Sequence, residues 1–250
     1  MKAHYWDILS KTYAYSQWLK SAVARSDYSL TKSILLEYLE PKENDVILEV
    51  GCGPGVWTKL IAEKCKKLIA IDISKDMLKR AKRYVNRKNV KFLLSDSFSQ
   101  TDFKFDKIFA VRSFEYIKDK AAAIERFNNL LRDNGKLVVV TKSKPCFWDF
   151  VYMQKWKKEK FCQEKVSYRV LRRLFSQFFD DVTLKPAIIR LPIFTEGNDE
   201  LPLVPKPLQK YFLNIFGRVT KISRKFPDNL MPIALIVSES YLACGTKKCL

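Results

Sequence analysis

Three glycines and one acidic residue form the segment of this sequence that is best suited to bind a ligand. They lie in the run Glu49-Val-Gly-Cys-Gly-Pro-Gly55, where glycine occupies alternate positions. Glycine lets the backbone turn tightly and lets a ligand approach where a Cβ would collide. A pyrophosphate needs bare amides at a helix N-terminus, and a carboxylate such as Glu49 would repel it. The pattern therefore favours a ligand with an ammonium group over a dinucleotide, and since no Gly-Lys-Ser/Thr follows, it excludes a nucleoside-triphosphate loop.

Two further acidic residues are expected at the same edge of the fold. Asp72 ends the apolar run Leu-Ile-Ala-Ile-Asp, and Asp96 follows the next apolar run in Leu-Leu-Ser-Asp-Ser. A carboxylate at Asp72 can accept hydrogen bonds from both hydroxyls of a ribose. Asp96 is placed to accept a hydrogen bond from an exocyclic adenine amine. Together with Glu49, these residues predict a site for a positively charged nucleoside.

The elements that must position these residues alternate between two periodicities. Runs rich in β-branched residues are separated by helix-like stretches, which is typical of βαβ units and predicts an α/β fold with a mostly parallel sheet and helices on both faces. Parallel strands bring their carboxyl ends to one edge, where open α/β sheets bind ligands. The expected strands cover 46–50, 68–73, 90–94, 107–111 and 137–141, and the expected helices cover 57–66, 75–86 and 118–131.

Further elements flank this core. Residues 1–40 are predicted to form two helices, the second ended by Pro41, and another helix is expected over 167–179. Strands are expected at 182–191 and 233–243. Between them, Leu208, Phe212, Ile215, Val219 and Ile222 recur at helical spacing and predict an amphipathic helix.

Composition limits the broad class of the protein. The 250 residues are 47% hydrophobic and 13% aromatic, which excludes a disordered chain and fits a single domain over 1–250. The six cysteines contain no Cys-x-x-Cys pair and stand beside a single histidine, so neither a structural zinc site nor any other metal centre is expected. Reduced thiols, together with the lack of a secretory signal or a membrane-spanning run, predict a cytoplasmic protein.

The motifs resemble those of the class I S-adenosylmethionine-dependent methyltransferases, most closely the type 11-like group that acts on small molecules. The resemblance implies a Rossmann-like doubly wound sheet of seven strands whose last strand is antiparallel. It implies S-adenosyl-L-methionine as the cofactor, held by a core over 45–141 beneath a helical cap over 1–40. The segments that carry the resemblance are Glu49–Gly55, Ala70–Ser74 with Met77, Ser95–Ser97, Phe105–Ile108 and Leu130–Val140.

The resemblance also implies roles for individual residues. Glu49, Gly51 and Gly53 would hold the methionine part of the cofactor, Asp72 the ribose, and Met77 one face of the adenine, while Asp96 and Ser97 would bind the adenine edge. Tyr5 and Tyr13 would close over the methionine carboxylate. The remaining expected cofactor contacts are Cys52, Gly55, Ile73 and Val111.

Methyl transfer from a sulfonium is an in-line displacement, for which the protein mainly holds nucleophile, methyl and sulfur in line. Arg112, Glu115 and Tyr116 follow the fourth expected strand and are the candidate catalytic residues. Arg112 could clamp a carboxylate or phosphate of the substrate. An alternative is that these charges begin a helix and face solvent.

The acceptor is expected to be a small or amphiphilic molecule, which could be lipid-linked, selected by lid segments over 143–166 and 192–232. The net charge of +19 keeps open an RNA methyltransferase that uses the basic C-terminal part. Nucleic acid is the less favoured partner, and no obligate protein partner is evident. The helical stripe that begins at Leu208 could lie on an anionic membrane, but we expect it to pack on the protein, with its lysines solvated.

Overall fold

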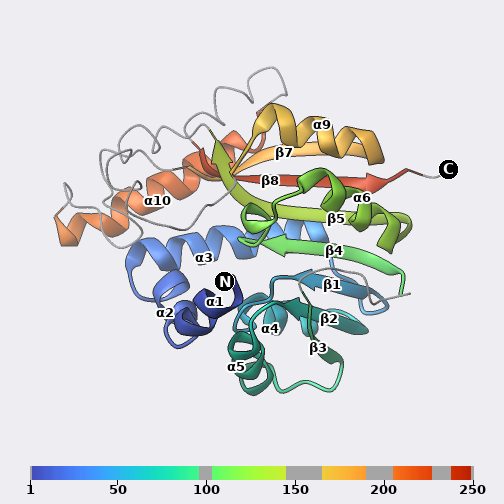
Figure 1. Cartoon of the computed structure of the whole chain (residues 1–250). Helices are drawn as coiled ribbons and strands as arrows, with labels where there is room; N and C mark the ends of the chain where they lie inside the picture. Colours follow the sequence, from blue (N-terminus) through green and yellow to red (C-terminus); the bar gives the residue numbers. More distant parts are fainter. Residues whose placement is uncertain (1, 96–102, 145–164, 190–204, 227–237, 249–250) are drawn as a thin grey trace.

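A single mixed sheet organises the chain in the computed structural model (Figure 1), which describes residues 2–95, 103–144, 165–189, 205–226 and 238–248. Its strands lie in the order β3-β2-β1-β4-β5-β8-β7, and the short β6 pairs with β5. The strands are β1 (Val46–Val50), β2 (Lys67–Asp72), β3 (Val90–Leu94), β4 (Phe105–Val111), β5 (Leu131–Lys144), β6 (Val166–Ser167), β7 (Phe179–Ile189) and β8 (Ser238–Lys247).

The direction of the strands confirms the predicted α/β class and the seven-stranded order with an antiparallel last strand. Strands β1 to β5 pair in parallel, whereas β8 is antiparallel to both β5 and β7. Strand β1 lies between β2 and β4. After β1 the chain adds β2 and β3 on one side of it, and then crosses to add β4 and β5 on the other side. This reversal is the switch point at which open α/β sheets form a ligand-binding crevice.

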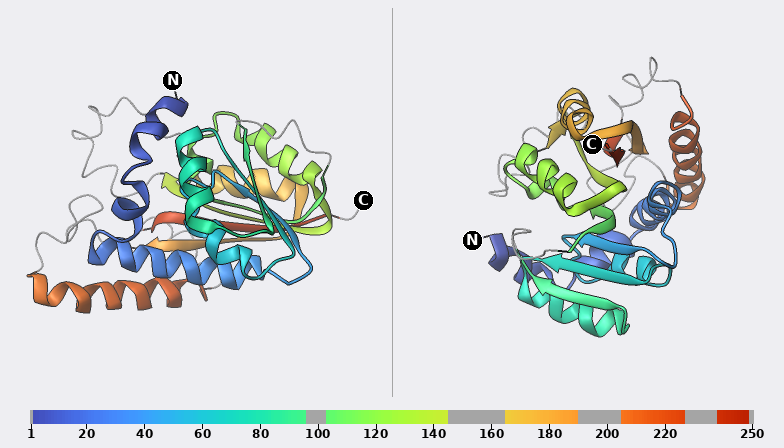
Figure 2. Two further views of the ribbon diagram at one scale, coloured as in Figure 1. Left: turned by 90° about the horizontal axis from the view of Figure 1, so that it is seen from below. Right: turned by 90° about the vertical axis from the view of Figure 1, so that its right-hand side faces the viewer.

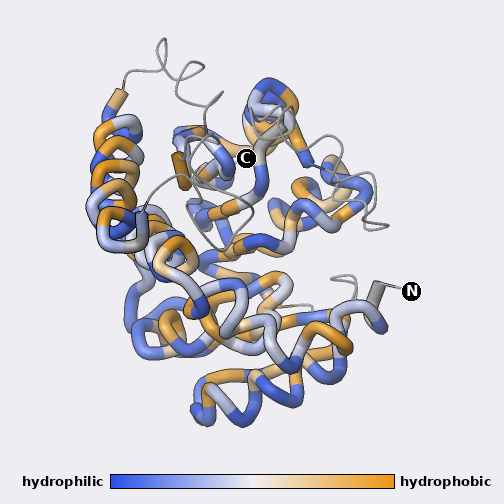
Figure 3. Tube along the Cα trace, turned by 90° about the vertical axis from the view of Figure 1, so that its left-hand side faces the viewer, coloured by the Kyte–Doolittle hydropathy of each residue, from blue (hydrophilic) through white to orange (hydrophobic). Residues whose placement is uncertain are grey.

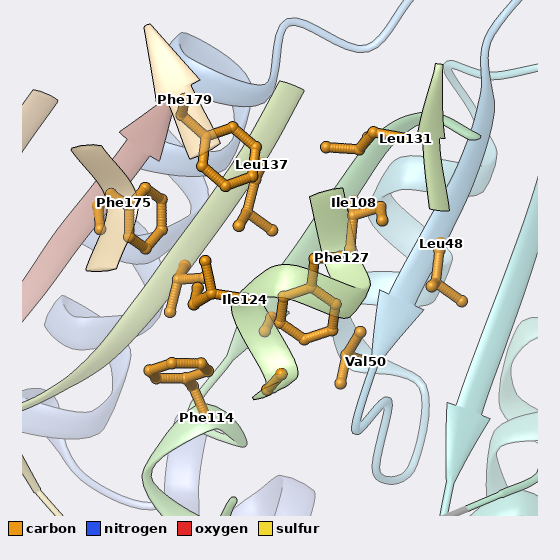
Figure 4. Close-up of a cluster of buried hydrophobic side chains, with 14 of the residues drawn as sticks. Leu48, Val50, Ile108, Phe114, Ile124, Phe127, Leu131, Leu137, Phe175 and Phe179 are labelled. Atoms are coloured by element: carbon orange, nitrogen blue, oxygen red, sulfur yellow. The ribbon is translucent and has the colours of Figure 1, made fainter. Parts of the chain in front are cut away.

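Helices cover both faces of the sheet, as predicted (Figure 2). They are α1 (Lys2–Leu9), α2 (Tyr13–Trp18), α3 (Ala22–Ile34), a π-helical turn η1 (Leu35–Leu39), α4 (Val56–Ala62), α5 (Lys75–Val85), a 3-10 turn η2 (Phe114–Tyr116), α6 (Lys120–Leu130), α9 (Tyr168–Phe178) and α10 (Lys206–Ser223). One hydrophobic cluster fills the face under α6 and α9, where Phe127 and Phe175 are fully buried (Figure 4). The cluster on the other face joins α3, η1 and α4, with Ile34 and Trp57 among its members.

The N-terminal segment differs from the prediction of two helices. Three helices and the η1 turn cover residues 2–39, because the chain turns twice before α3. Helix α1 ends at Leu9, and the amide of Ser10 closes its last turn on the carbonyls of Trp6 and Asp7. The hydroxyl of Ser21 accepts from the Ala24 amide and caps the start of α3. Polar caps of this kind decide where helices begin more sharply than apolar spacing does.

The expected apolar face of α10 is wrong in part, whereas α9 buries Leu171 and Phe175 and leaves Val170 exposed. On α10, the residues that pack on the protein include Leu213, Phe216 and Thr220, which lie to one side of the predicted stripe. In that stripe Phe212 is half-buried, whereas four members are exposed: Leu208, Ile215, Val219 and Ile222. Spacing identifies an apolar arc on a helix, but it does not say which arc meets the sheet.

Candidate functional site

The glycine loop lies at the switch point, between the ends of β1 and β2. The amides of Gly51 and Cys52 both donate to the carbonyl of Ile71, at 2.9 Å. The carboxylate of Asp72 accepts from the Gly53 amide at 2.8 Å through Oδ2 and from the Ser74 amide at 2.9 Å through Oδ1. Asp72 therefore fastens the loop after β1 to the loop after β2 and fixes the shape of the predicted cofactor site.

The three glycines of the loop have different structural roles. All have positive φ angles, of 71°, 52° and 88° for Gly51, Gly53 and Gly55. A Cβ on Gly51 would lie 2.4 Å from the Cβ of Ser113, and one on Gly55 would lie 2.9 Å from Cγ2 of Val85. Among the described residues, a Cβ on Gly53 would meet only the Tyr13 ring, at 3.9 Å. Gly51 and Gly55 are thus required by packing, and Gly53 is the position that leaves room for a ligand.

Glu49 lies beneath the loop and is almost completely buried. Its Oε2 accepts a hydrogen bond from the Thr58 hydroxyl at 2.6 Å, which ties β1 to α4. Burial raises the pKa of Glu49 from 4.5 to about 8, so its carboxyl is mostly protonated at neutral pH. The contact with an ammonium group that the sequence predicts for Glu49 stays a prediction.

The N-terminal helices cover the loop. Oδ1 of Asp7 accepts from the Ser74 hydroxyl at 2.5 Å and from the Asp76 amide at 3.3 Å, so α1 is held to the start of α5. The Trp6 ring packs edge-on against Tyr13 and Tyr116, with ring centroids 5.8 and 4.9 Å apart. Aromatic side chains of the cap therefore reach both the glycine loop and the segment after β4.

Tyr13 is a cap residue whose ring lies beside Gly53. Its hydroxyl interacts electrostatically with Arg112, Glu115 and Asp72, and burial raises its pKa to about 12. Tyr13 therefore remains a neutral phenol that can donate a hydrogen bond at any physiological pH. Tyr5 packs edge-on against Trp6 and is partly exposed. The predicted closure of both tyrosines over a carboxylate remains a prediction.

Buried charges gather after β4, where the sequence predicts Arg112, Glu115 and Tyr116 as catalytic residues. Nε of Arg112 lies 3.4 Å from Oε1 of Glu115, and its Nη1 donates to the Ser240 hydroxyl at 3.0 Å. Oε1 of Glu239 lies 3.9 Å from the same Nη1. Arg112 and Glu115 are buried, so the alternative of solvent-facing charges is wrong for them. Arg112 also has a φ of 56°, an unfavourable angle that its buried contacts hold in place.

Spacing along the chain did not identify every member of this charge cluster. Ser240 and Glu239 come from β8, and Lys142 comes from β5. Burial, together with the neighbouring Arg112, lowers the pKa of Lys142 to about 8. The only signals in the sequence are a lysine directly after the apolar run 137–141 and a glutamate within the expected strand 233–243, and neither is specific.

The remaining predicted cofactor contacts divide into two groups. Cys52, Met77 and Val111 are buried in hydrophobic packing, and Ile73 is half-buried beside Asp72. Asp96 and Ser97, like most of the two expected lid segments, lie outside the described residues. The part of the chain that the structure describes holds no group of three or more His, Cys, Asp or Glu side chains that could bind a metal ion. The structure therefore brings together Tyr13, Gly53, Asp72, Arg112 and Glu115, and these fit a nucleoside with a charged, polar tail. 

Known proteins are similar to this chain in sequence or in fold. A malonyl-[acyl-carrier protein] O-methyltransferase of Ilyobacter polytropus is 27% identical over 139 residues, which cover 52% of this chain and 54% of that protein. The chain spans about half the length of the curated relatives that it matches first. Two solved structures share the fold. One is the Haloferax volcanii complex of the Trm112 methyltransferase activator with a methyltransferase (TM-score 0.64, 15% identity, 98% of each chain). The other is the N-methyltransferase NodS of Bradyrhizobium japonicum with S-adenosyl-L-homocysteine (TM-score 0.57, 16% identity, 92% of this chain and 89% of that one).

A family model extends the likeness over most of the chain. The model described as a methyltransferase domain matches residues 23–185, which include the glycine loop, Asp72, Arg112 and Glu115. The match runs through every parallel strand of the sheet, whereas Tyr13 and the β8 residues Glu239 and Ser240 lie outside it. This chain belongs to the class I S-adenosylmethionine-dependent methyltransferase family.

Proposed function

We propose that the chain transfers a methyl group to a small or amphiphilic acceptor, including one linked to a lipid, as a single domain over residues 1–250. The cofactor of the family, S-adenosyl-L-methionine, supplies an electrophilic methyl group when it is bound. Gly53 provides the room for its methionine part, and Asp72 retains lone pairs for the ribose hydroxyls beside the two amides that it already accepts from. The resemblance assigns the adenine to Met77, Asp96 and Ser97.

The covering of the loop by α1 and α2 is the observation that carries the choice of a small acceptor. The hydrogen bond between Asp7 and Ser74 and the ring contact between Trp6 and Tyr116 close the approach above the carboxyl ends of β2 and β4. A polymer such as RNA would need an open surface at this edge to place one nucleotide beside the methyl group. A small molecule, or a group at the end of a flexible carrier, can enter beneath the cap.

The charge cluster after β4 supports the same choice. Oε1 of Glu115 is buried and accepts no hydrogen bond from the described residues, although Arg112 lies 3.4 Å away. A buried acceptor of this kind can bind an N–H or O–H of the acceptor molecule and orient its lone pair. Arg112, held by Ser240 and Glu239, sets the position of Glu115. The curated relative named for malonyl-[acyl-carrier protein] supports a small group presented on a carrier.

Two measurements test the proposed function in sequence. Isothermal calorimetry with S-adenosylmethionine and S-adenosylhomocysteine should detect binding at a ratio of one per chain, and the absence of heat with either would refute cofactor binding. Fractions of a cell extract are then incubated with the chain and methyl-labelled cofactor. We expect label in the small-molecule or lipid fraction, whereas label in RNA alone would favour the alternative of an RNA methyltransferase that uses the basic C-terminal part.

A further inference from the structure

Helix α10 presents an apolar face to solvent along its whole length. Its exposed apolar residues follow one another at intervals of three or four residues, from the first turn to just beyond the last. At about 100° per residue they fall within an arc of about 80°. They are 36–64% exposed: Leu208, Tyr211, Ile215, Val219, Ile222 and Phe226. We call these six residues the outer stripe.

The outer stripe cannot turn inward, because the opposite side of α10 is fixed to the protein. Phe216 and Leu213 pack against Val23 of α3. The Thr220 hydroxyl accepts a hydrogen bond from the Ile189 amide at 3.1 Å. Arg224, just after the helix, donates to the carbonyls of Pro186 and Ala187. The helix is therefore held by one side to β7 and α3, and the outer stripe is a stable part of the molecular surface.

A row of cationic residues runs beside the outer stripe. Lys210, Arg218, Lys221 and Lys225 are exposed and fall on one flank of the helix, with Asn214 among them. The sequence from 203 to 226 contains no acidic residue. Figure 3 shows how apolar and polar residues alternate along this helix, at the left of the view. One flank of α10 is thus cationic, its outer side is apolar, and its remaining side is buried.

We infer that α10 binds the surface of an anionic lipid bilayer, with the outer stripe inserted and the cationic flank against the headgroups. An apolar arc beside a row of lysines and arginines is complementary to a bilayer whose acyl region lies beneath negative headgroups. Within the described residues, no helix is long and apolar enough to cross a membrane, so a helix lying in the plane of the surface is the relevant geometry.

Other occupants explain fewer of these features. RNA phosphates would bind the lysines, but exposed Leu, Ile and Val side chains add nothing to a phosphate contact. A second copy of the chain would cover the outer stripe, yet it would bring another cationic flank into the same interface. The bilayer is the partner that uses both the apolar arc and the positive charge.

The position of α10 is also suitable for a surface contact. Two views show it on the outside of the molecule, beside α3 and next to the edge strand β7 (Figure 2). Its N-terminal end projects on the side where α1 and α2 cover the glycine loop (Figure 1). Contact through α10 would therefore hold the cap side of the molecule near the bilayer. The inference goes beyond the proposed methyl transfer and does not depend on it.

The test measures partition of the full chain onto phosphatidylcholine vesicles with or without phosphatidylglycerol, by flotation. We expect binding only to the anionic vesicles. Val219→Asp should weaken it about tenfold or more, because a carboxylate replaces an inserted side chain. Val170→Asp on α9 is the matched control, since Val170 is 48% exposed and Val219 is 45% exposed. We expect the control to bind within about twofold of the unchanged chain.

A second pair of variants separates the cationic flank from overall charge. Arg218→Glu, Lys221→Glu and Lys225→Glu together lower the net charge from +19 to +13, as do Lys79→Glu, Lys82→Glu and Arg83→Glu on α5. Each charge near the surface is worth about fivefold, so the α10 triple should weaken binding by at least about 100-fold and the α5 triple far less. Equal losses from the two triples would overturn the inference.

Three further results would also overturn it. One is no binding of the unchanged chain to anionic vesicles. Another is unchanged binding by Val219→Asp, and the third is a dimer in solution, detected by light scattering, that only Val219→Asp disrupts. Binding of bulk RNA without binding of vesicles would assign the cationic flank to nucleic acid instead. Calorimetry with S-adenosylhomocysteine on the same samples keeps failure of this inference distinct from failure of the proposed function.

Discussion

The glycine loop allows two nearly identical substitutions to separate packing from ligand binding. Gly51→Ala and Gly53→Ala each add one methyl group to a residue with positive φ, of 71° and 52°. The new methyl at position 51 would collide with the Ser113 side chain, at 2.4 Å from its Cβ. At position 53 it would make only an ordinary contact with Tyr13, at 3.9 Å. The two variants should therefore fail in different ways.

The magnitudes follow from these contacts. A side chain in the left-handed region costs about 1–2 kcal/mol, and this cost applies at both positions. Overpacking adds about 1–3 kcal/mol at position 51 only. We expect the free energy of unfolding to fall by about 2–5 kcal/mol in Gly51→Ala and by about 1–2 kcal/mol in Gly53→Ala. Because the methyl of Gly53→Ala occupies the space proposed for the ligand, affinity for S-adenosylhomocysteine should fall about tenfold or more.

Urea unfolding and calorimetry measure the two effects separately. Removing the obstructing side chain with Ser113→Gly in the Gly51→Ala background should restore about 1–3 kcal/mol, after correction for Ser113→Gly alone. The correction is needed because the Ser113 hydroxyl donates to the Val50 carbonyl at 2.6 Å. Equal destabilisation by the two alanine variants would refute the packing argument. Unchanged ligand affinity in Gly53→Ala would refute the position of the ligand.

Three other substitutions test single contacts. Folding raises the pKa of Glu49 from 4.5 to about 8, so the stabilisation from its protonated carboxyl is full below about pH 4.5 and is lost as pH rises through 8. Glu49→Gln should therefore remove about 5 kcal/mol of the pH dependence of the free energy of unfolding, measured with urea. An unchanged pH dependence would refute this expectation. Asp72→Asn places an amide NH2 opposite the Gly53 or Ser74 amide, so S-adenosylhomocysteine affinity should fall about tenfold or more by calorimetry; equal affinity contradicts this. Arg224→Met deprives two buried carbonyls of their donor and should cost about 2–4 kcal/mol in urea unfolding, whereas no loss would show that Arg224 does not fasten α10.

The sheet could be predicted from the sequence because local patterns determine most of it. Short apolar runs alternate with helices, and the parallel pairings β1–β2, β2–β3 and β4–β5 each join consecutive strands. Strands β1 and β3 match their expected bounds. Helix α4 ends at Ala62, earlier than the apolar spacing suggests, because the Asn89 side chain donates to the carbonyls of Ala62 and Cys65. Such a contact joins residues distant in the chain, so spacing could not reveal it.

The candidate site was predictable only on the side that local sequence builds. The glycine loop, Asp72 and the residues after β4 follow the carboxyl ends of the parallel strands β1, β2 and β4, so their meeting at one edge follows from the parallel sheet. The positions of Ser240 and Glu239, which contact Arg112, do not follow from the parallel strands. Ser240 is 128 residues away along the chain and reaches Arg112 only because β8 inserts between β5 and β7. An antiparallel insertion of this kind depends on long-range pairing, which periodicity does not encode.

Helix α10 shows why the same periodicity can predict a helix correctly and its orientation wrongly. The helix carries two apolar arcs, one through Phe216 and one through Val219, and both satisfy the spacing of an amphipathic helix. Polar groups choose between them. Thr220 and Arg224 lie on the arc of Phe216 and bind backbone groups of β7, which would otherwise be buried without partners. Turning the Val219 arc inward would remove these hydrogen bonds, so the protein leaves that arc, with its adjoining cations, for a partner outside the chain.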